Sequence, residues 1–174
     1  MAGILIIAHA PFASALRDCV AHIYGGVPAH IGVIDVLPDS DPTQVIAFAQ
    51  AEIERLREAN GALVLTDMYG ATPANIASRL ASLPDVRVLA GANLPMLVRA
   101  VCYRTAPLDA LVDKALTGAA NGVHAIGPQM SPSEGCSPAP CLPATGAPAA
   151  TAAACAEAGT VLGAPLAGGR RAGP

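Results

Sequence analysis

Short runs of mostly aliphatic residues recur along the first 128 residues of the chain, and turn-forming residues separate them. Runs of about four to eight apolar residues bounded in this way are typical of buried β-strands. The sequence predicts strands at 4–8, 31–36, 62–66 and 86–90, and a last short strand at 122–126.

The segments between these runs carry apolar residues at helical spacing. The segment from 42 to 59 places Val45, Ile46, Ala49, Ile53 and Leu56 on one face. Asp41 is the expected N-cap of this helix, with Pro42 at the first helical position and Gly61 suited to a C-terminal cap. Further helices are expected at about 11–24, from Thr72-Pro73 onward, at about 94–104 and at about 107–117.

Apolar strands that alternate with helices predict an α/β fold of three layers, with a mostly parallel sheet and helices on both faces. Right-handed crossovers place the carboxyl ends of all parallel strands along one edge. In open sheets of this kind, ligands and chemistry lie at that edge.

Composition narrows the class of function. Hydrophobic residues make up 53% of the chain and charged residues only 13%, and the net charge is -3. Neither a nucleic acid nor an anionic membrane is therefore expected as a partner. No apolar run is long enough for a membrane span, and the N-terminal run ends too early for a secretory signal, so a cytoplasmic protein is expected. Five cysteines without a CxxC pair favour neither a disulfide framework nor a zinc site, and Cys136 and Cys141 are at best a weak metal-binding pair.

The chain changes character after Pro128. Ala, Pro and Gly dominate residues 129–174, and large apolar side chains are rare there. A segment of this composition does not bury enough surface to offset its ordering entropy, so it is interpreted as a disordered tail or linker. The predicted organisation is one domain at 1–128 followed by this tail.

Two of the predicted strands end in titratable residues. The first strand leads into His9 and the third into Asp67. If these strands are neighbours, the two side chains emerge side by side. A carboxylate bonded to one ring nitrogen fixes the imidazole tautomer, leaves the other nitrogen as a nucleophile and stabilises the ring once it is phosphorylated.

The residues after Asp67 are suited to an anion. Thr72 is a candidate N-cap, Pro73 would be the first helical residue, and Asn75 and Ile76 would offer free backbone amides. Gly70 would let the backbone approach closely. Each feature has an ordinary structural explanation on its own; the combination at one sheet edge favours a phosphoryl site. His22, His30 and His124 have no evident acidic partner in the sequence and are interpreted as structural.

Three segments, "GILIIAHAPFASAL", "GALVLTDMYGATPANIA" and "VRVLAGANLPMLVRAVCYR", resemble the enzyme IIA domain of the mannose family of the bacterial phosphoenolpyruvate-dependent sugar phosphotransferase system (PTS). The resemblance extends over roughly residues 1 to 127. It implies a phosphocarrier domain without a cofactor or metal, which takes a phosphoryl group from the phosphocarrier HPr and passes it to a IIB component. His9 matches the phosphorylated histidine, Asp67 the carboxylate that orients it, and Thr72 a hydroxyl residue that contacts the phosphoryl group.

The resemblance further implies a homodimer in which the last strand, at 122–126, is exchanged between subunits, and peripheral association with a membrane permease complex. Phe12, Met68 and Tyr69 are candidates for docking HPr, although Phe12 and Met68 are also plausible core residues. In fused members of the family, a linker of similar composition to residues 129–174 leads to a IIB domain. A chain end altered by a change of reading frame is an equally open explanation of that segment.

One departure from the family affects the site. The usual Gly-Gly-Ser-Pro is Gly70-Ala71-Thr72-Pro73 here. A positive φ at Ala71 would cost about 1 kcal/mol or more, because its Cβ crowds the backbone. Replacing serine by threonine keeps the hydroxyl, so function is expected to persist with some change in rate or partner fit.

Several alternatives stay open on sequence grounds. The same His9 could act as a regulatory phosphorylation switch without sugar transport, and the phosphotransfer subunit of dihydroxyacetone kinase shares the fold, although "NLPM" fits the mannose family better. A nucleotide binder is disfavoured because no strand leads into GxGxxG or GxxxxGK[ST]. A histidine phosphatase would need an arginine beside His9, where Ala8 stands, and metal-dependent hydrolysis lacks a ligand set. The sugar and the phosphoryl acceptor are not encoded in these residues.

Overall fold

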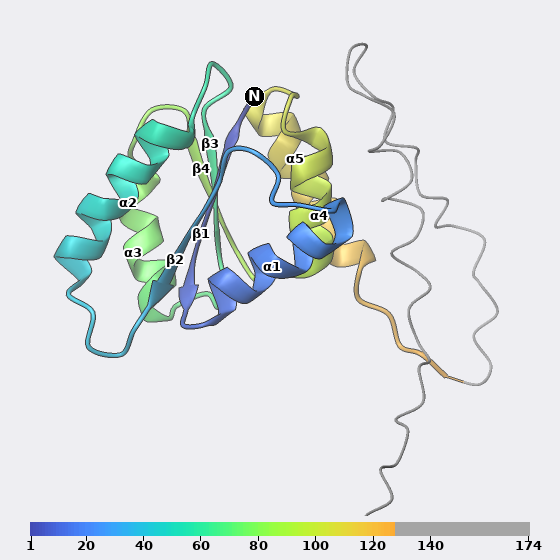
Figure 1. Cartoon of the computed structure of the whole chain (residues 1–174), viewed down its shortest axis with the longest axis horizontal. Helices are drawn as coiled ribbons and strands as arrows, with labels where there is room; N and C mark the ends of the chain where they lie inside the picture. The colour runs from blue at the N-terminus through green and yellow to red at the C-terminus, as the bar shows by residue number, and fades with distance from the viewer. Residues whose placement is uncertain (128–174) are drawn as a thin grey trace, which may run out of the picture.

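The computed structural model describes residues 1–127, and the predicted tail at 129–174 lies outside them. Within the described residues, strands alternate with helices as expected (Figure 1). The elements are β1 (Gly3–His9), α1 (Phe12–Tyr24), β2 (Ile31–Val36), α2 (Pro42–Leu56), β3 (Ala62–Thr66), α3 (Thr72–Leu80), β4 (Val86–Ala90), α4 (Leu94–Tyr103) and α5 (Leu108–Asn121).

The four strands form one parallel sheet in the order β2-β1-β3-β4. β1 lies between β2 and β3, so that Ile4 is opposite Ile31 on one side and Leu63 on the other. The two strands that end at His9 and Asp67 are therefore neighbours, as the site hypothesis requires.

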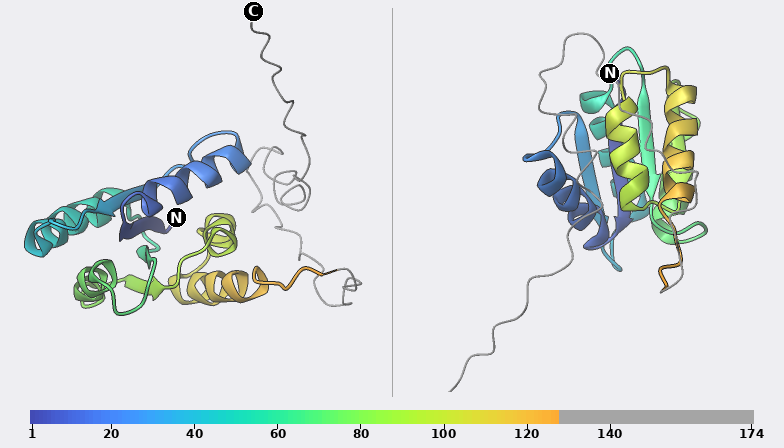
Figure 2. Two further views of the ribbon diagram at one scale, coloured as in Figure 1. Left: turned by 90° about the horizontal axis from the view of Figure 1, so that it is seen from below. Right: turned by 90° about the vertical axis from the view of Figure 1, so that its right-hand side faces the viewer.

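Helices cover both faces of the sheet. α1, α4 and α5 pack on one face, and α2 and α3 pack on the other (Figures 1 and 2). The helices that follow β1 and β3 thus lie on opposite faces. The carboxyl ends of these two strands form a topological switch point, which is the usual ligand position in open α/β sheets.

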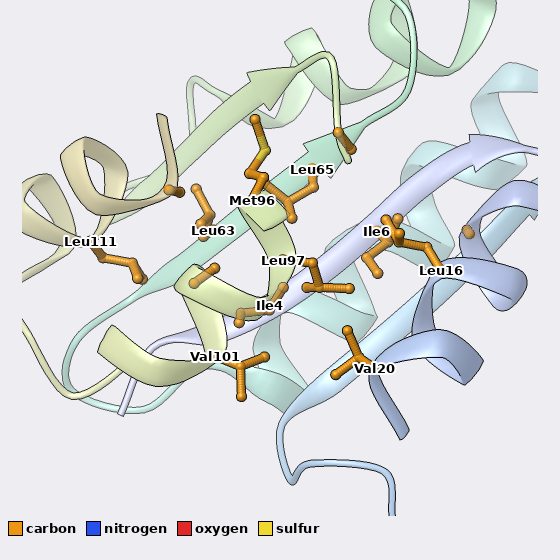
Figure 3. Packing of buried hydrophobic residues seen from close by; sticks show 14 of the residues in the cluster. Ile4, Ile6, Leu16, Val20, Leu63, Leu65, Met96, Leu97, Val101 and Leu111 are labelled. Carbon is orange, nitrogen blue, oxygen red and sulfur yellow. The ribbon is translucent and has the colours of Figure 1, made fainter. Parts of the chain in front are cut away.

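Two aliphatic clusters hold the layers together. Alternate residues of β1 face opposite clusters. Ile4 and Ile6 pack toward α1, α4 and α5 (Figure 3). Leu5 and Ile7 pack toward α2 and α3. Every residue of β1 except His9 is buried. A central strand of a parallel sheet is buried on both faces, which explains why its sequence is continuously apolar rather than alternating.

Local sequence signals explain where α2 begins, but not where it ends. The Asp41 carboxylate accepts a hydrogen bond from the Thr43 amide at 2.9 Å, and Pro42 follows as the first helical residue, as predicted. The prediction that this helix continues to Ala59 is wrong, since it ends at Leu56 and Arg57 is extended. Gly61 does not cap it: its φ of +75° belongs to the turn that leads into β3, where a side chain would collide with the Asp85 carbonyl.

The predicted strand at 122–126 is absent from the described chain. α5 extends to Asn121, beyond the expected end near 117, and the residues after it lie in no helix or strand. Val123 and Ile126 are 74% and 96% exposed. A strand requires a partner backbone, and this segment pairs with none of β1 to β4.

Candidate phosphorylation site

His9 is the last residue of β1 and the point at which the strand leaves the core. The six residues before it are buried, whereas the His9 side chain is 49% exposed. The aliphatic strand thus carries an imidazole to the carboxyl edge of the sheet, where it is accessible to solvent.

Asp67 immediately follows β3 and binds His9 twice through one oxygen. Its Oδ2 atom accepts a hydrogen bond from the His9 backbone amide at 2.9 Å and lies 2.7 Å from His9 Nδ1. Its Oδ1 atom accepts from the Met68 amide at 2.8 Å. Because an ionised carboxylate only accepts hydrogen bonds, His9 Nδ1 carries the proton and Nε2 keeps its lone pair.

The same contacts keep Asp67 ionised. Partial burial is the largest single influence on its pKa and acts to raise it. The hydrogen bonds from the His9 amide, the His9 ring and the Met68 amide together outweigh burial, so the pKa of Asp67 lies below its ordinary value. The carboxylate is therefore available to orient the ring and to balance a positive charge on it.

The turn after Asp67 differs in detail from the sequence prediction. Gly70 has a φ of +83°, in the left-handed region, whereas Ala71 is extended with a φ of -79°. The positive φ considered for Ala71 therefore lies one residue earlier, and the Ala71 Cβ causes no backbone strain.

The start of α3 also requires correction. The N-cap is Ala71 rather than Thr72, and Thr72 and Pro73 are the first two helical residues. The Asn75 amide is not free, because it donates to the Ala71 carbonyl at 2.9 Å. The free amides expected at the start of α3 are therefore those of Thr72 and Ala74, and no side chain among residues 1–127 caps this end.

The structure thus brings His9 and Asp67 into contact, while the remaining predicted residues lie on the adjoining turn. Thr72 is exposed at the start of α3, and within residues 1–127 no hydrogen bond joins it to His9 or Asp67. Gly70 and Ala71 connect the carboxylate to the helix. The contact between His9 and Asp67 is confirmed, whereas the catalytic roles of this pair and the phosphoryl-binding role of Gly70, Ala71 and Thr72 stay predictions.

Sequence reasoning missed Asp35, which lies in β2, the other neighbour of β1, opposite Ala8. Its Oδ1 atom accepts hydrogen bonds from the Ala13 and Ser14 amides, at 3.0 and 3.2 Å, across the start of α1. The available signal was an acidic residue inside the otherwise apolar run "IGVIDV". Sequence alone did not reveal its partner, because the bond joins residues about twenty positions apart.

The other histidines lie away from this pair. His30 precedes β2 at the opposite edge of the sheet, where its Nδ1 is 3.1 Å from the Leu56 carbonyl oxygen. Its Nε2 lies 3.3 Å from Glu58 Oε1, so the expectation that His30 has no acidic partner is wrong. His124 contacts the Asn121 carbonyl beyond α5.

Two features are absent from residues 1–127. No cluster of three or more histidine, cysteine or acidic residues there is arranged to hold a metal ion. None of the helices in that part of the chain is long and apolar enough to cross a membrane.

Exposed apolar side chains follow the carboxyl ends of three neighbouring strands, at the same edge of the sheet as His9. Phe12 follows β1, Leu37 follows β2, and Met68 and Tyr69 follow β3. Their exposed fractions are 38%, 55%, 61% and 89%, respectively. Phe12 and Met68 are therefore surface residues rather than members of the core, and we refer to these four residues as the apolar rim.

The fold and the site together define an α/β protein with an exposed histidine, oriented by a carboxylate, at the switch point of a parallel sheet. The family model described as the PTS system fructose IIA component, EIIA-man, matches residues 3–116. The mannose-specific EIIAB component of Escherichia coli K12 is 33% identical over 118 residues, which are 66% of this chain and 36% of that protein. The sorbose-specific EIIA component of Lacticaseibacillus casei is 32% identical over 96 residues, 55% of this chain and 68% of that protein.

Solved structures agree with this result. The PTS component EIIA from Streptococcus agalactiae superposes with a TM-score of 0.65 at 32% identity, covering 72% of this chain and 97% of that one. The mannose/sorbose-specific IIA subunit from Enterococcus faecalis, at 23% identity and a TM-score of 0.65, covers 75% and 98% and shares the fold. The chain belongs to the mannose-type EIIA family of the sugar phosphotransferase system. It spans about a third of the length of the mannose-specific EIIAB relatives that it matches.

Proposed function

We propose that this chain is a phosphocarrier that accepts a phosphoryl group from phospho-HPr on Nε2 of His9 and passes it to a IIB component. The observation that carries the proposal is the 2.7 Å contact between His9 Nδ1 and Asp67 Oδ2. This contact leaves Nε2 as the nucleophilic nitrogen, on a side chain that is 49% exposed.

The transfer is a displacement at phosphorus. The Nε2 lone pair of His9 forms the new P–N bond while the P–N bond of the donor breaks, and the bonding electrons return to the donor nitrogen. The His9 ring gains positive charge because Nδ1 keeps its proton. The Asp67 carboxylate stabilises that charge, and its lowered pKa keeps it ionised throughout.

In this proposal, the phosphoryl oxygens bind at the start of α3. Thr72 is exposed, and the Thr72 and Ala74 amides precede the first intrahelical hydrogen bond at Asn75. Uncapped amides at the positive end of a helix dipole favour an anion. Gly70 and Ala71 set the direction in which this turn enters the helix.

The apolar rim supports a transient protein interface around His9. Exposed apolar side chains that surround a reactive group are suited to a partner that binds, transfers and leaves. In this proposal HPr and the IIB component use the rim in turn, and the carrier works at the cytoplasmic side of a membrane permease complex.

We also propose the exchanged dimer. The segment 122–126 pairs with none of the strands β1 to β4, its Val123 and Ile126 are exposed, and β4 is an edge strand of that four-stranded sheet. If this segment paired with β4 of a second copy, the pairing would cover both the exposed segment and the open edge of β4. Light scattering of the full chain and of a variant that ends at Asn121 tests this, with a dimer expected only for the full chain.

Labelling tests the phosphocarrier assignment. Phosphoenolpyruvate, enzyme I and HPr should add one phosphoryl group to the chain, and a IIB protein should remove it. His9→Ala should abolish the label, whereas His22→Ala, which removes a histidine of α1, should keep it. A label that persists in His9→Ala would contradict the assignment. A label that IIB never removes would favour a regulatory switch on the same histidine.

A further inference from the structure

The segment from His9 to Ser14, which we call the His9 loop, runs from the last residue of β1 into the first turn of α1. It is hydrogen-bonded to β2 as well as to Asp67 after β3. β1 and β2 stay paired as far as His9 opposite Val36. The next residue continues the contact, because the Ala10 amide donates to the Val36 carbonyl at 3.1 Å. The backbone on both sides of the histidine is therefore attached to a neighbouring strand.

Asp35 provides the next attachment. It lies in β2 opposite Ala8 and is partly buried. Its Oδ1 accepts from the Ala13 amide at 3.0 Å and from the Ser14 amide at 3.2 Å. These are amides of the first turn of α1, which lack intrahelical partners. The N-cap residue of α1 is Pro11, which makes no side-chain capping bond, so the cap comes from another strand.

The imidazole depends on this backbone for its position. With half of its side chain exposed, His9 is not fixed by packing, and the only side chain that it is hydrogen-bonded to in residues 1–127 is Asp67. The Asp67 bond needs the His9 backbone amide and the ring in a set relation to one carboxylate oxygen. A shift of the segment from His9 to Ser14 would break that relation.

The two helices that start beside the site differ in one respect. The first turn of α1 is occupied by the Asp35 carboxylate, whereas α3 has no side-chain cap. An acidic cap fills the amides that an anion would otherwise use at α1. The start of α3 is the one of the two that stays available for a phosphoryl group.

We propose that Asp35 is a positioning residue for the phosphoryl acceptor: by capping α1 from β2, it fixes the loop that holds the His9 ring in the tautomer bonded to Asp67. Asp35 does not touch the reacting nitrogen and acts through the backbone of Ala13 and Ser14. A test of this inference by the rate of phosphorylation rests on the proposed phosphocarrier function, whereas a test by the tautomer of the His9 ring does not.

The test compares three variants. Asp35→Ala removes the cap, and Asp35→Asn keeps an oxygen that can accept from both amides. Asp41→Ala is the matched control, because Asp41 caps α2 by the same kind of bond, to the Thr43 amide, without contacting the His9 loop. Nitrogen-15 spectra of the His9 ring at about pH 8, where a free imidazole is neutral, report its tautomer directly.

The wild type, Asp35→Asn and Asp41→Ala should show the Nδ1-protonated form of His9. Asp35→Ala should show a mixture of the two tautomers, and its phosphorylation by phospho-HPr should slow about tenfold to a hundredfold, the effect of misplacing a reacting group by about 1 Å. The same tautomer and rate in Asp35→Ala as in Asp41→Ala would overturn the proposal. A mixed tautomer in Asp35→Asn as well would overturn the hydrogen-bond mechanism.

A measurement on the unmodified chain covers the case in which Asp35→Ala does not fold. Amide exchange of Ala13 and Ser14 should be slow, because both are hydrogen-bonded although they belong to a first helical turn. Fast exchange at both would overturn the cap. If the wild type is not phosphorylated at all, the phosphocarrier proposal fails, while the tautomer and exchange results still decide the role of Asp35.

Discussion

His9 Nδ1 lies 2.7 Å from Asp67 Oδ2, although the two residues are 58 positions apart in the sequence. The contact arises because β1 and β3 are adjacent and parallel and both end at the same edge of the sheet. The strand order thus brings the Asp67 carboxylate to Nδ1 of His9, and Nε2 is the ring nitrogen that this contact leaves unbonded.

Asp67→Asn should lower the rate of phosphorylation by phospho-HPr by about a hundredfold or more, within the usual range for losing an acid–base partner. An asparagine can turn its NH₂ group toward the ring, which favours the proton on Nε2 and removes the nucleophilic lone pair. Rapid-quench kinetics measures the rate. Asp41→Asn, at the same edge of the sheet, is the control and should retain it; equal rates in the two variants would exclude an orienting role.

The lowered pKa of Asp67 predicts a pH-dependent contribution to stability. Its ordinary pKa is about 3.9, and in the folded chain the value is lower. The stabilisation is therefore fully present above the unfolded value and is lost as pH falls through the folded value. Urea unfolding of the wild type and Asp67→Asn at several pH values measures it. The difference in free energy of unfolding should shrink below about pH 4; a difference that grows on acidification would contradict the pKa direction.

The backbone of the turn before α3 predicts how substitutions at Gly70 and Ala71 change the stability of the fold. Gly70→Ala should destabilise the fold by about 1–2 kcal/mol, because a side chain is unfavourable at a φ of +83°. Ala71→Gly should give no gain and should cost up to about 1 kcal/mol, because Ala71 is already in an ordinary extended conformation. Chemical denaturation compares the two; a more stable Ala71→Gly would show that the alanine is strained.

Thr72 should act through its hydroxyl. Thr72→Ser should keep the phosphorylation rate within about threefold, whereas Thr72→Ala should lower it about tenfold, as expected for one hydrogen bond to a charged group of about 1.5 kcal/mol. Ser78→Ala removes another exposed hydroxyl from α3 and serves as the control. A Thr72→Ala rate equal to that of Ser78→Ala would remove Thr72 from the site.

The fold was predictable wherever the signal was local. Four strands, the Asp41 cap and the alternation of elements follow from apolar runs and capping residues in the sequence itself. The adjacency of β1 and β3 was a condition that the sequence left open, and the sheet order meets it. The end of α2 at Leu56 was not predictable in this way, because the apolar and charged pattern continues past it while the chain already turns toward β3.

The sequence predicted the His9–Asp67 pair of the candidate site, but not the contacts of Asp35 or the first residue of α3. His9 and Asp67 each end an apolar run, which is a visible signal. Asp35 was missed because its partners belong to a different element, and Ala71 replaced Thr72 as N-cap because the helix begins one residue earlier than its Thr-Pro signature indicates. The segment at 122–126 has strand-like composition but pairs with no strand within residues 1–127.

The most direct test of the central claim is to identify the phosphorylated atom. Nitrogen-15 and phosphorus-31 spectra of the chain after incubation with phosphoenolpyruvate, enzyme I and HPr show which ring nitrogen carries phosphorus. The Asp67 contact predicts a phosphoryl group on Nε2 of His9, with Nδ1 protonated. Phosphorylation of Nδ1, or of any residue other than His9, would contradict the account.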